Sequence, residues 1–347
     1  MIVIVGAAGE TARRLIEFAR RSRVSLRLGA RSPVSARESL GALADGFDIC
    51  RIDARDAPSV MAALEPGDVL VNATTPAGAL GHGLAKAAIT AGAHYVAFSG
   101  EVADTLRLLR ELDKPARERG VTLCAGAGSA LPDFAVRLAL QQLPDATDGC
   151  TGISLGDFVP SYGTLQSEMH IMNGPGVVIQ DGDLIEEVVV GKVIRHGALT
   201  FVERPLIDPL MVWTYARLRS FRSGINVPPE AVDSTVGMFV KTAETLKSEA
   251  GRTTYLEQIS AFAGRRIPEN EGSLQGRVTA VVWNGSRQAR IVVTARPIYE
   301  NTARAALLVS RELDELKDRA AGFQAPSTIV RSIEFGLEAL SSTIVDL

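Results

Sequence analysis

Short apolar runs and helically spaced apolar residues alternate through the first 125 residues of the chain. Four consecutive apolar residues, Ile2 to Val5, precede Leu15, Ile16 and Ala19 at helical spacing, and a second strand-like stretch with alternating apolar residues follows at 24–29. A continuous apolar run is typical of a strand buried on both faces, whereas apolar residues three and four apart are typical of an amphipathic helix. The pattern therefore predicts one βαβ unit by residue 29.

The alternation continues to residue 124, and every connection is short. Strict alternation of strands and helices predicts a parallel, doubly wound Rossmann sheet that is covered by helices on both faces. The further elements are expected at 35–44 (helix), 47–52 (strand), 59–64 (helix), 68–73 (strand), 80–91 (helix), 95–98 (strand), 103–120 (helix) and 121–124 (strand).

The pattern changes near residue 150, where period-two alternation and the hairpin turns Asp181-Gly182 and Asn284-Gly285 begin. This change predicts a second α+β domain with an antiparallel sheet. Residues 205–228 are irregular, and we interpret them as a lid or an interface arm. The expected strands lie at 152–159, 177–180, 184–192, 277–283 and 287–295, and the expected helices at 300–316 and from 326 to 340. The expected domains are a dinucleotide-binding domain, 1–132 with 324–347, and a substrate and dimerisation domain, 133–323.

Glycines punctuate the turn between the first strand and the first helix. Gly6 permits a sharp turn, Gly9 lets backbone N–H groups approach a pyrophosphate, and the small Ala12 lets the helix pack closely on the strand. The spacing is looser than Gly-x-Gly-x-x-Gly, but it stands between a strand and a helix, which is the context that a dinucleotide site requires. We expect the phosphates at this helix N-terminus, against Gly6, Ala8, Gly9, Glu10 and Thr11.

The end of the second strand indicates which dinucleotide is bound. NAD-selective sites carry a carboxylate there, but this chain has Arg31 and Ser32. A guanidinium binds a 2′-phosphate in a bidentate way, so we infer NADP; the alternative is a solvated surface arginine. Asp53 follows the third strand and either contacts the adenine amine or forms a turn.

Composition excludes several other classes. Lys and Arg number 37 against 40 Asp and Glu, so the net charge of -3 gives no bulk attraction to nucleic acid. The 3 cysteines and 4 histidines have no metal-ligand spacing, so no metal site is expected. No apolar run approaches the roughly 20 residues of a membrane span. We expect a cytoplasmic protein without a signal peptide.

Six further motifs lie in the two expected domains, at 71–76, 84–96, 99–101, 126–133, 161–164 and 299–303. Together they resemble the saccharopine dehydrogenase family, which includes trans-acting enoyl reductases. The resemblance implies NADP-dependent hydride transfer, usually to C=N or conjugated C=C, in a two-domain fold whose last helix returns to the Rossmann domain.

The resembling motifs supply the remaining cofactor candidates. Ala73, Thr74, Thr75 and Pro76 close the fourth strand beside the expected nicotinamide end. Ser99 and Gly128 lie in two further motifs of the family and are also expected at the cofactor.

The chain departs from the family at one carboxylate. Many members have an acid where this chain has Ala97, so any role of that acid is absent here. No tyrosine has a lysine four residues later, so the mechanism of short-chain dehydrogenases is unsupported.

Few side chains are needed to reduce an iminium or an activated alkene, because positioning supplies most of the rate. Tyr162 is the first candidate proton donor or substrate anchor, or else it packs between the domains. His170, about two helical turns later, is a candidate acid or an ordinary helix histidine. Glu101 is the third candidate catalytic residue. Like Asp133 it flanks a turn at the carboxyl end of a strand, where open α/β sheets bind ligands; the alternative for both is helix capping or pairing with the dipole of the first helical turn.

These residues favour an NADPH-dependent reductase of a small or carrier-bound metabolite, expected as a homodimer without nucleic-acid or membrane partners. The first alternative is a synthase or lyase that uses the nucleotide transiently, with no net turnover. The second alternative is a non-catalytic NADP-binding sensor or partner subunit.

Overall fold

The computed structural model describes residues 1–75, 77–154, 160–261, 276–315 and 320–346. The chain forms two compact units, and each unit is assembled from separate stretches of sequence. The first unit comprises Met1–Gly100, Asp104–Ala130 and Tyr299–Leu340. The second unit comprises Glu101–Ala103, Leu131–Ile298 and Ser341–Leu347.

Strands alternate with helices along the first unit. In chain order its elements are β1 (Ile2–Val5), α1 (Glu10–Arg21), β2 (Leu26–Ala30), α2 (Pro33–Leu40), η1 (Gly41–Ala44), β3 (Asp48–Arg51), α3 (Ala57–Met61), β4 (Val69–Asn72), α4 (Ala77–Ala91), β5 (His94–Ala97), α5 (Val102–Arg119), β6 (Thr122–Cys124), η2 (Ala127–Ser129), α11 (Ile298–Glu315), β15 (Gly322–Phe323), α12 (Pro326–Ile329) and α13 (Ile333–Ala339).

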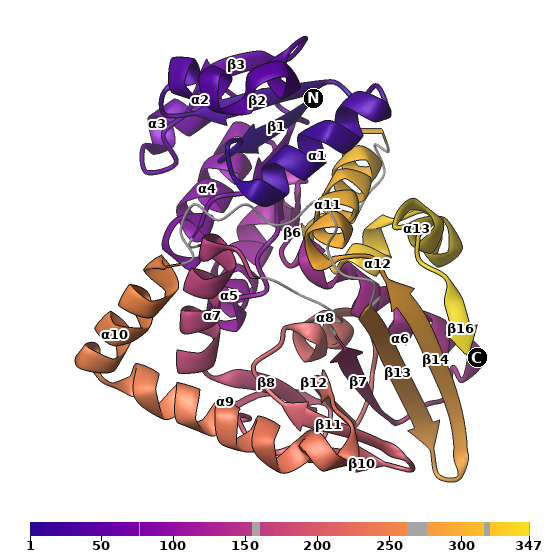
Figure 1. The fold of residues 1–347 in the computed structure, drawn as a ribbon. Coiled ribbons are helices and arrows are strands. Elements are labelled where there is room, and N and C mark those ends of the chain that lie inside the picture. Colours follow the sequence, from indigo (N-terminus) through magenta and orange to yellow (C-terminus); the bar gives the residue numbers. More distant parts are fainter. Residues whose placement is uncertain (76, 155–159, 262–275, 316–319, 347) are drawn as a thin grey trace. The chain divides into compact units, whose positions relative to one another are not determined.

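The strands of the first unit form one seven-stranded sheet in the order β15-β6-β5-β4-β1-β2-β3 (Figure 1). Every paired strand in it runs parallel. The predicted doubly wound Rossmann sheet is therefore confirmed. Strand order reverses beside β1, which pairs with β2 on one side and β4 on the other. Ligands of open α/β sheets bind at such a reversal, outside the carboxyl ends of the strands.

The first strand is buried on both faces, as its apolar run predicts. Ile2, Val3 and Ile4 are completely buried. On one face Ile2 and Ile4 share a core with Leu15 and Ile16 of α1. Those two residues belong to an apolar stripe at helical spacing, so burial of that stripe fixes which face of α1 meets the sheet.

Helix α11 belongs to this unit, although the expected domain 133–323 grouped it with the other one. Ala303, Ala306 and Val309 are buried in the same core as β1. Figure 1 shows α11 beside α1, and the Arg304 guanidinium lies over the Phe18 ring of α1, 4.3 Å from its centroid. The chain then adds β15 to the sheet edge beside β6, and only residues from 341 onward rejoin the second unit.

The second unit combines a large sheet with helices. In chain order its elements are α6 (Ala130–Gln142), β7 (Asp148–Ser154), α7 (Tyr162–Asn173), β8 (Gly176–Gln180), β9 (Asp183–Glu187), β10 (Val193–His196), β11 (Leu199–Glu203), α8 (Asp208–Tyr215), β12 (Ser220–Asn226), η3 (Pro229–Ala231), α9 (Val232–Lys247), α10 (Glu249–Ser260), β13 (Gly276–Asn284), β14 (Arg287–Ala295) and β16 (Ile344–Asp346).

This nine-stranded sheet follows the order β10-β11-β12-β7-β13-β14-β16, with β8 paired to β12 and β9 paired to β8. Its strand pairs are antiparallel except for the parallel pair β7–β12. The predicted second α+β domain is confirmed, with a sheet that is mixed and mainly antiparallel. Residues 155–159, where the first expected strand of this domain was to end, and Leu316 of the expected helix 300–316 lie outside the described residues.

The interpretation of residues 205–228 as a lid or an interface arm is wrong. They form the buried helix α8 and the strand β12, which lies inside the sheet between β11 and β7. The error arises because β12 is polar and yet partly buried. Its Arg222 donates to both carboxylate oxygens of buried Glu203, at 3.0 and 3.1 Å, so the partner strand β11 supplies the compensation that burial of a charge requires.

Candidate functional site

The turn that follows β1 has no room for a side chain at its first residue. A Cβ on Gly6 would lie 2.8 Å from the Ala73 carbonyl oxygen at the end of β4, and the φ of Gly6 is +85°. Both the contact and the positive φ favour glycine. The carboxyl ends of β1 and β4 therefore approach each other closely through bare backbone, as a dinucleotide cradle requires.

The N-terminus of α1 is open to a ligand. Gly9 is its N-cap residue, has no side chain to cap the helix, and is exposed together with Ala8. The first N–H groups of a helix lack partners inside the helix and carry a partial positive charge, so they suit a phosphate. Glu10 and Thr11 are half-buried there. The Arg14 Nε lies 3.6 Å from the Glu10 Oε1, and this ion pair offsets the negative charge of Glu10.

Thr74 is held in place at the end of β4 by a side chain of that strand. Buried Asn72 accepts hydrogen bonds at Oδ1 from the Thr74 N–H at 2.9 Å and from the Thr74 hydroxyl at 2.6 Å. Thr75 is exposed, and Ala73 and Thr74 are half-buried. Pro76, also expected at the cofactor, lies outside the described residues. The structure thus brings Gly6, Ala73 and Thr74 together.

Arg31 lies in the turn after β2 with its side chain exposed. Among the described residues its guanidinium has no hydrogen-bond or ion-pair partner. Ser32 caps α2, because its Oγ accepts from the Ser35 N–H at 3.3 Å and also contacts the Ser35 Oγ at 3.0 Å. An unpaired guanidinium beside two hydroxyls and a helix N-terminus fits a 2′-phosphate.

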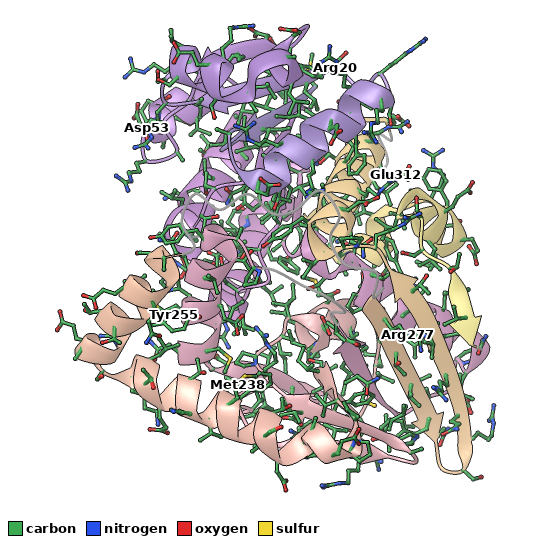
Figure 2. The ribbon with its side chains drawn as sticks, viewed as in Figure 1. Arg20, Asp53, Met238, Tyr255, Arg277 and Glu312 are labelled. Atoms are coloured by element: carbon green, nitrogen blue, oxygen red, sulfur yellow. The ribbon has the colours of Figure 1, made fainter. Side chains whose placement is uncertain are left out.

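Three other expected cofactor residues have structural partners. Asp53, labelled in Figure 2, accepts from the Arg55 N–H at 3.0 Å, which is the contact of a turn-forming aspartate. Gly128 approaches the Phe98 carbonyl so closely that a Cβ would lie 3.0 Å from the oxygen. Half-buried Ser99 follows Phe98, so the turns after β5 and β6 meet there.

The second unit carries the expected chemistry on α7. Ser161 caps this helix through the Thr164 N–H at 3.2 Å, which places Tyr162 at its first residue. The Gln166 amide donates to the Tyr162 hydroxyl at 3.2 Å. Since that bond uses a lone pair of the oxygen, the phenolic proton remains able to donate. Exposed His170 lies in the last turn of α7, about 12 Å further along the helix axis, so the structure does not bring these two side chains together.

Glu101 is buried and binds α7. The Ser167 hydroxyl donates to Glu101 Oε1 at 2.9 Å, although the two residues are separated by 66 positions. This hydrogen bond gives Glu101 a role in holding the helix that carries Tyr162.

The second unit contains two buried carboxyls, of which the sequence identifies only one. Asp133 and Asp208 are 1% and 2% exposed, and buried Thr151 donates to Asp208 Oδ2 at 3.0 Å. Burial, reinforced by the charge of Asp133, raises the pKa of Asp208 to about 7. The sequence singled out Asp133 from its place after the sixth strand, whereas Asp208 stands in the segment that was misread as irregular.

The described residues contain no cluster of three or more histidine, cysteine, aspartate or glutamate side chains suited to a metal ion. Within the same residues, no helix has both the length and the apolar character needed to cross a membrane.

The reversal of strand order, the glycine turn and the open helix N-terminus define a Rossmann domain that binds a dinucleotide. Residues 2–124 match the family model of the saccharopine dehydrogenase NADP binding domain. This match confirms the predicted resemblance to the saccharopine dehydrogenase family over these residues, and it confirms the predicted cofactor NADP.

A solved structure has the same fold over both units. It is the apo form of saccharopine dehydrogenase (L-Glu forming) from Saccharomyces cerevisiae, with 13% sequence identity, coverage of 99% of each chain and a TM-score of 0.56. At this identity the similarity shows the fold alone.

A curated relative is the lipid droplet localized protein of Caenorhabditis elegans. It is 26% identical over 226 residues, which are 59% of this chain and 52% of that protein. The match thus spans about half the length of the relative.

Replacement of Arg31 by alanine should weaken NADPH binding about 10- to 100-fold and leave NADH binding nearly unchanged, because the charge-assisted contact to the 2′-phosphate is lost. Isothermal titration of both nucleotides measures the two affinities. Equal losses for NADPH and NADH would contradict the assignment.

Arg23→Ala is the matched control for this measurement. Arg23 is exposed and precedes the amino end of β2, whereas Arg31 follows its carboxyl end. The control variant loses the same charge at the other end of β2, away from the expected cofactor site, and should bind NADPH as the native protein does.

Asp208→Asn should change how stability depends on pH. Because the folded-state pKa of Asp208 is raised from 3.8 to about 7, its contribution to the free energy of unfolding is largest at low pH. That contribution is lost as the pH rises through the folded pKa. Between pH 5 and 7 the free energy of unfolding of the native protein should fall by about 2 kcal/mol more than that of the variant.

Urea unfolding at a series of pH values checks this, with the difference between the two proteins as the readout. Burial lowers the pKa of His94 and raises that of Glu203, but both groups contribute equally to the two proteins. A difference that stays constant with pH would show that Asp208 is ionised throughout.

Proposed function

We propose that the protein is an NADPH-dependent reductase that acts on a C=N bond or a conjugated C=C bond of a small or carrier-bound metabolite. The observation that carries the proposal is the NADP-binding domain followed by a second unit, with the fold of a saccharopine dehydrogenase over the whole chain. The resemblance of the motifs to that family supports reduction of such a bond.

The residues of the first unit fit the cofactor. Gly6 and Gly9 leave backbone exposed where a pyrophosphate binds at the N-terminus of α1. Arg31 and Ser32 would receive the 2′-phosphate, and Thr74 would contact the nicotinamide end. When bound in its reduced form, the cofactor supplies the hydride that forms the new C–H bond.

We assign the second unit, from about residue 133, to the substrate, with Tyr162 as first candidate for the proton donor. Reduction of a polarised double bond is completed by one proton at the atom opposite the new C–H bond. The Tyr162 hydroxyl retains a proton to donate, and Gln166 orients its oxygen. His170, exposed at the other end of α7, stays the second candidate.

The reaction class is tested by NADPH oxidation with panels of imines, enoyl thioesters and 2-oxo acids with amines. Loss of NADPH absorbance with one class supports the proposal and names the bond. Product formation without net loss of NADPH would indicate a synthase or lyase with transient redox. Tight NADPH binding without turnover of any panel would indicate a sensor or partner subunit.

Tyr162→Phe should lower kcat about 100-fold on the substrate so identified and leave NADPH affinity unchanged, because the proton donor is lost while the cofactor site is intact. Steady-state kinetics and a nucleotide titration measure the two effects. Tyr255→Phe, which removes a hydroxyl from α10, is the control. An unchanged kcat would remove Tyr162 from the mechanism.

We further propose a homodimer and a cytoplasmic location. Ile344 and Val345 of the edge strand β16 are 39% and 53% exposed, which supports pairing of two copies. Light scattering should give twice the mass of 36.9 kDa; a monomer would contradict the dimer. The name of the worm relative makes a lipid droplet surface the alternative location, which cell fractionation distinguishes.

A further inference from the structure

A chain of buried polar side chains leads from the interior of the first unit to Thr74. Asn72 is 2% exposed and Tyr95 is completely buried. The Asn72 Nδ2 group donates to the Tyr95 hydroxyl at 2.9 Å, while its Oδ1 accepts both hydrogen bonds from Thr74. Three residues of β4, β5 and the turn after β4 are thus joined through one amide.

The direction of each hydrogen bond among Thr74, Asn72 and Tyr95 follows from one backbone group. The Thr74 N–H can only donate, so the Asn72 atom facing it is the oxygen. The amide nitrogen must then face Tyr95, whose hydroxyl accepts. The Tyr95 proton is therefore not used in the bond to Asn72.

Asp104 of α5 is the carboxylate beside Tyr95. A Cβ on Gly81 of α4 would lie 2.7 Å from the Asp104 Oδ2 and 3.2 Å from the Tyr95 hydroxyl. The carboxylate and the hydroxyl therefore both lie against Gly81 and close to each other. Burial, with the Asp104 charge as a further cause, raises the pKa of Tyr95. Tyr95 therefore stays protonated and able to donate.

The outcome is a hydroxyl of fixed polarity where the carboxyl ends of β1 and β4 meet. Because the Thr74 hydroxyl donates its only proton to Asn72, its oxygen is left as an acceptor. Thr74 is half-buried, and the preceding carbonyl of Ala73 lies against Gly6. A ligand group that meets the Thr74 oxygen must therefore bring an N–H or O–H donor.

We propose that Asn72 and Tyr95 are positioning residues that present the Thr74 hydroxyl as an acceptor to the nicotinamide riboside end of NADP. The donor is the carboxamide NH2 or a ribose hydroxyl, and these two share the same hydrogen-bond chemistry. The inference rests on the cofactor site of the proposed function and adds the residues that orient the reacting end.

Isothermal titration with three probes tests the inference: NADP+, 2′-phospho-ADP-ribose, which lacks nicotinamide, and adenosine 2′,5′-bisphosphate, which lacks the whole nicotinamide riboside end. Tyr95→Phe and Thr74→Val should each weaken NADP+ binding about fivefold, as expected for one neutral hydrogen bond. Neither variant should alter the affinity for adenosine 2′,5′-bisphosphate. A matching loss for 2′-phospho-ADP-ribose identifies the ribose as the donor, and a loss for NADP+ alone identifies the carboxamide.

The double variant separates positioning from mere stability. If Tyr95 acts only through Thr74, combining Tyr95→Phe with Thr74→Val should weaken NADP+ binding no more than Thr74→Val alone. Tyr255→Phe in the second unit should bind all three probes as the native protein does. Should Tyr95→Phe not fold, Thr74→Val tests the acceptor by itself.

Losses that are equal for all three probes, or no loss for NADP+, would overturn the inference. A native protein that binds neither NADP+ nor NADPH would instead overturn the proposed function. The two failures are therefore distinct.

Discussion

The contact between Gly6 and the Ala73 carbonyl is the constraint on which the cofactor site depends. A Cβ at residue 6 would lie 2.8 Å from that oxygen, so β1 and β4 can end side by side only if one of them ends in bare backbone. This is also the point at which the strand order of the sheet reverses. The open N-terminus of α1 lies a few residues after Gly6, and Thr74 directly follows Ala73. The residues expected at the pyrophosphate and those expected at the nicotinamide end are therefore both fixed by this one contact.

The first unit could be predicted from the sequence because its signals are local. The apolar run Ile2 to Val5, the helical spacing of Leu15 and Ile16, and the glycine turn each report the structure within a few residues. The strand β12 could not be predicted in this way. Its Arg222 is compatible with a strand inside the sheet because Glu203 of β11, whose register partner is Gly224, accepts its hydrogen bonds. That pairing is a property of the fold rather than of the segment.

The same distinction divides the candidate site. The exposed Arg31 and the glycine turn are identified by their position after a strand, and the match to an NADP-binding domain agrees with them. The contacts of Glu101 depend on Ser167, 66 residues away, and therefore could not be read from a motif. Asp53 shows the opposite case, since its hydrogen bond to the Arg55 N–H follows from local turn chemistry that was already one of its two interpretations.

The two buried polar clusters also differ in how they respond to pH. In the first unit the Asn72 amide joins the Tyr95 phenol to Thr74, and the phenol stays neutral near pH 7 because its pKa is raised above its ordinary value. In the second unit the pKa of Asp208 is about 7, so that carboxyl does change charge there. A cofactor held through neutral groups keeps the same hydrogen-bond polarity on both sides of pH 7. The raised pKa of Asp208 thus gives the second unit a pH dependence that the neutral side chains of Asn72 and Tyr95 do not give the first unit.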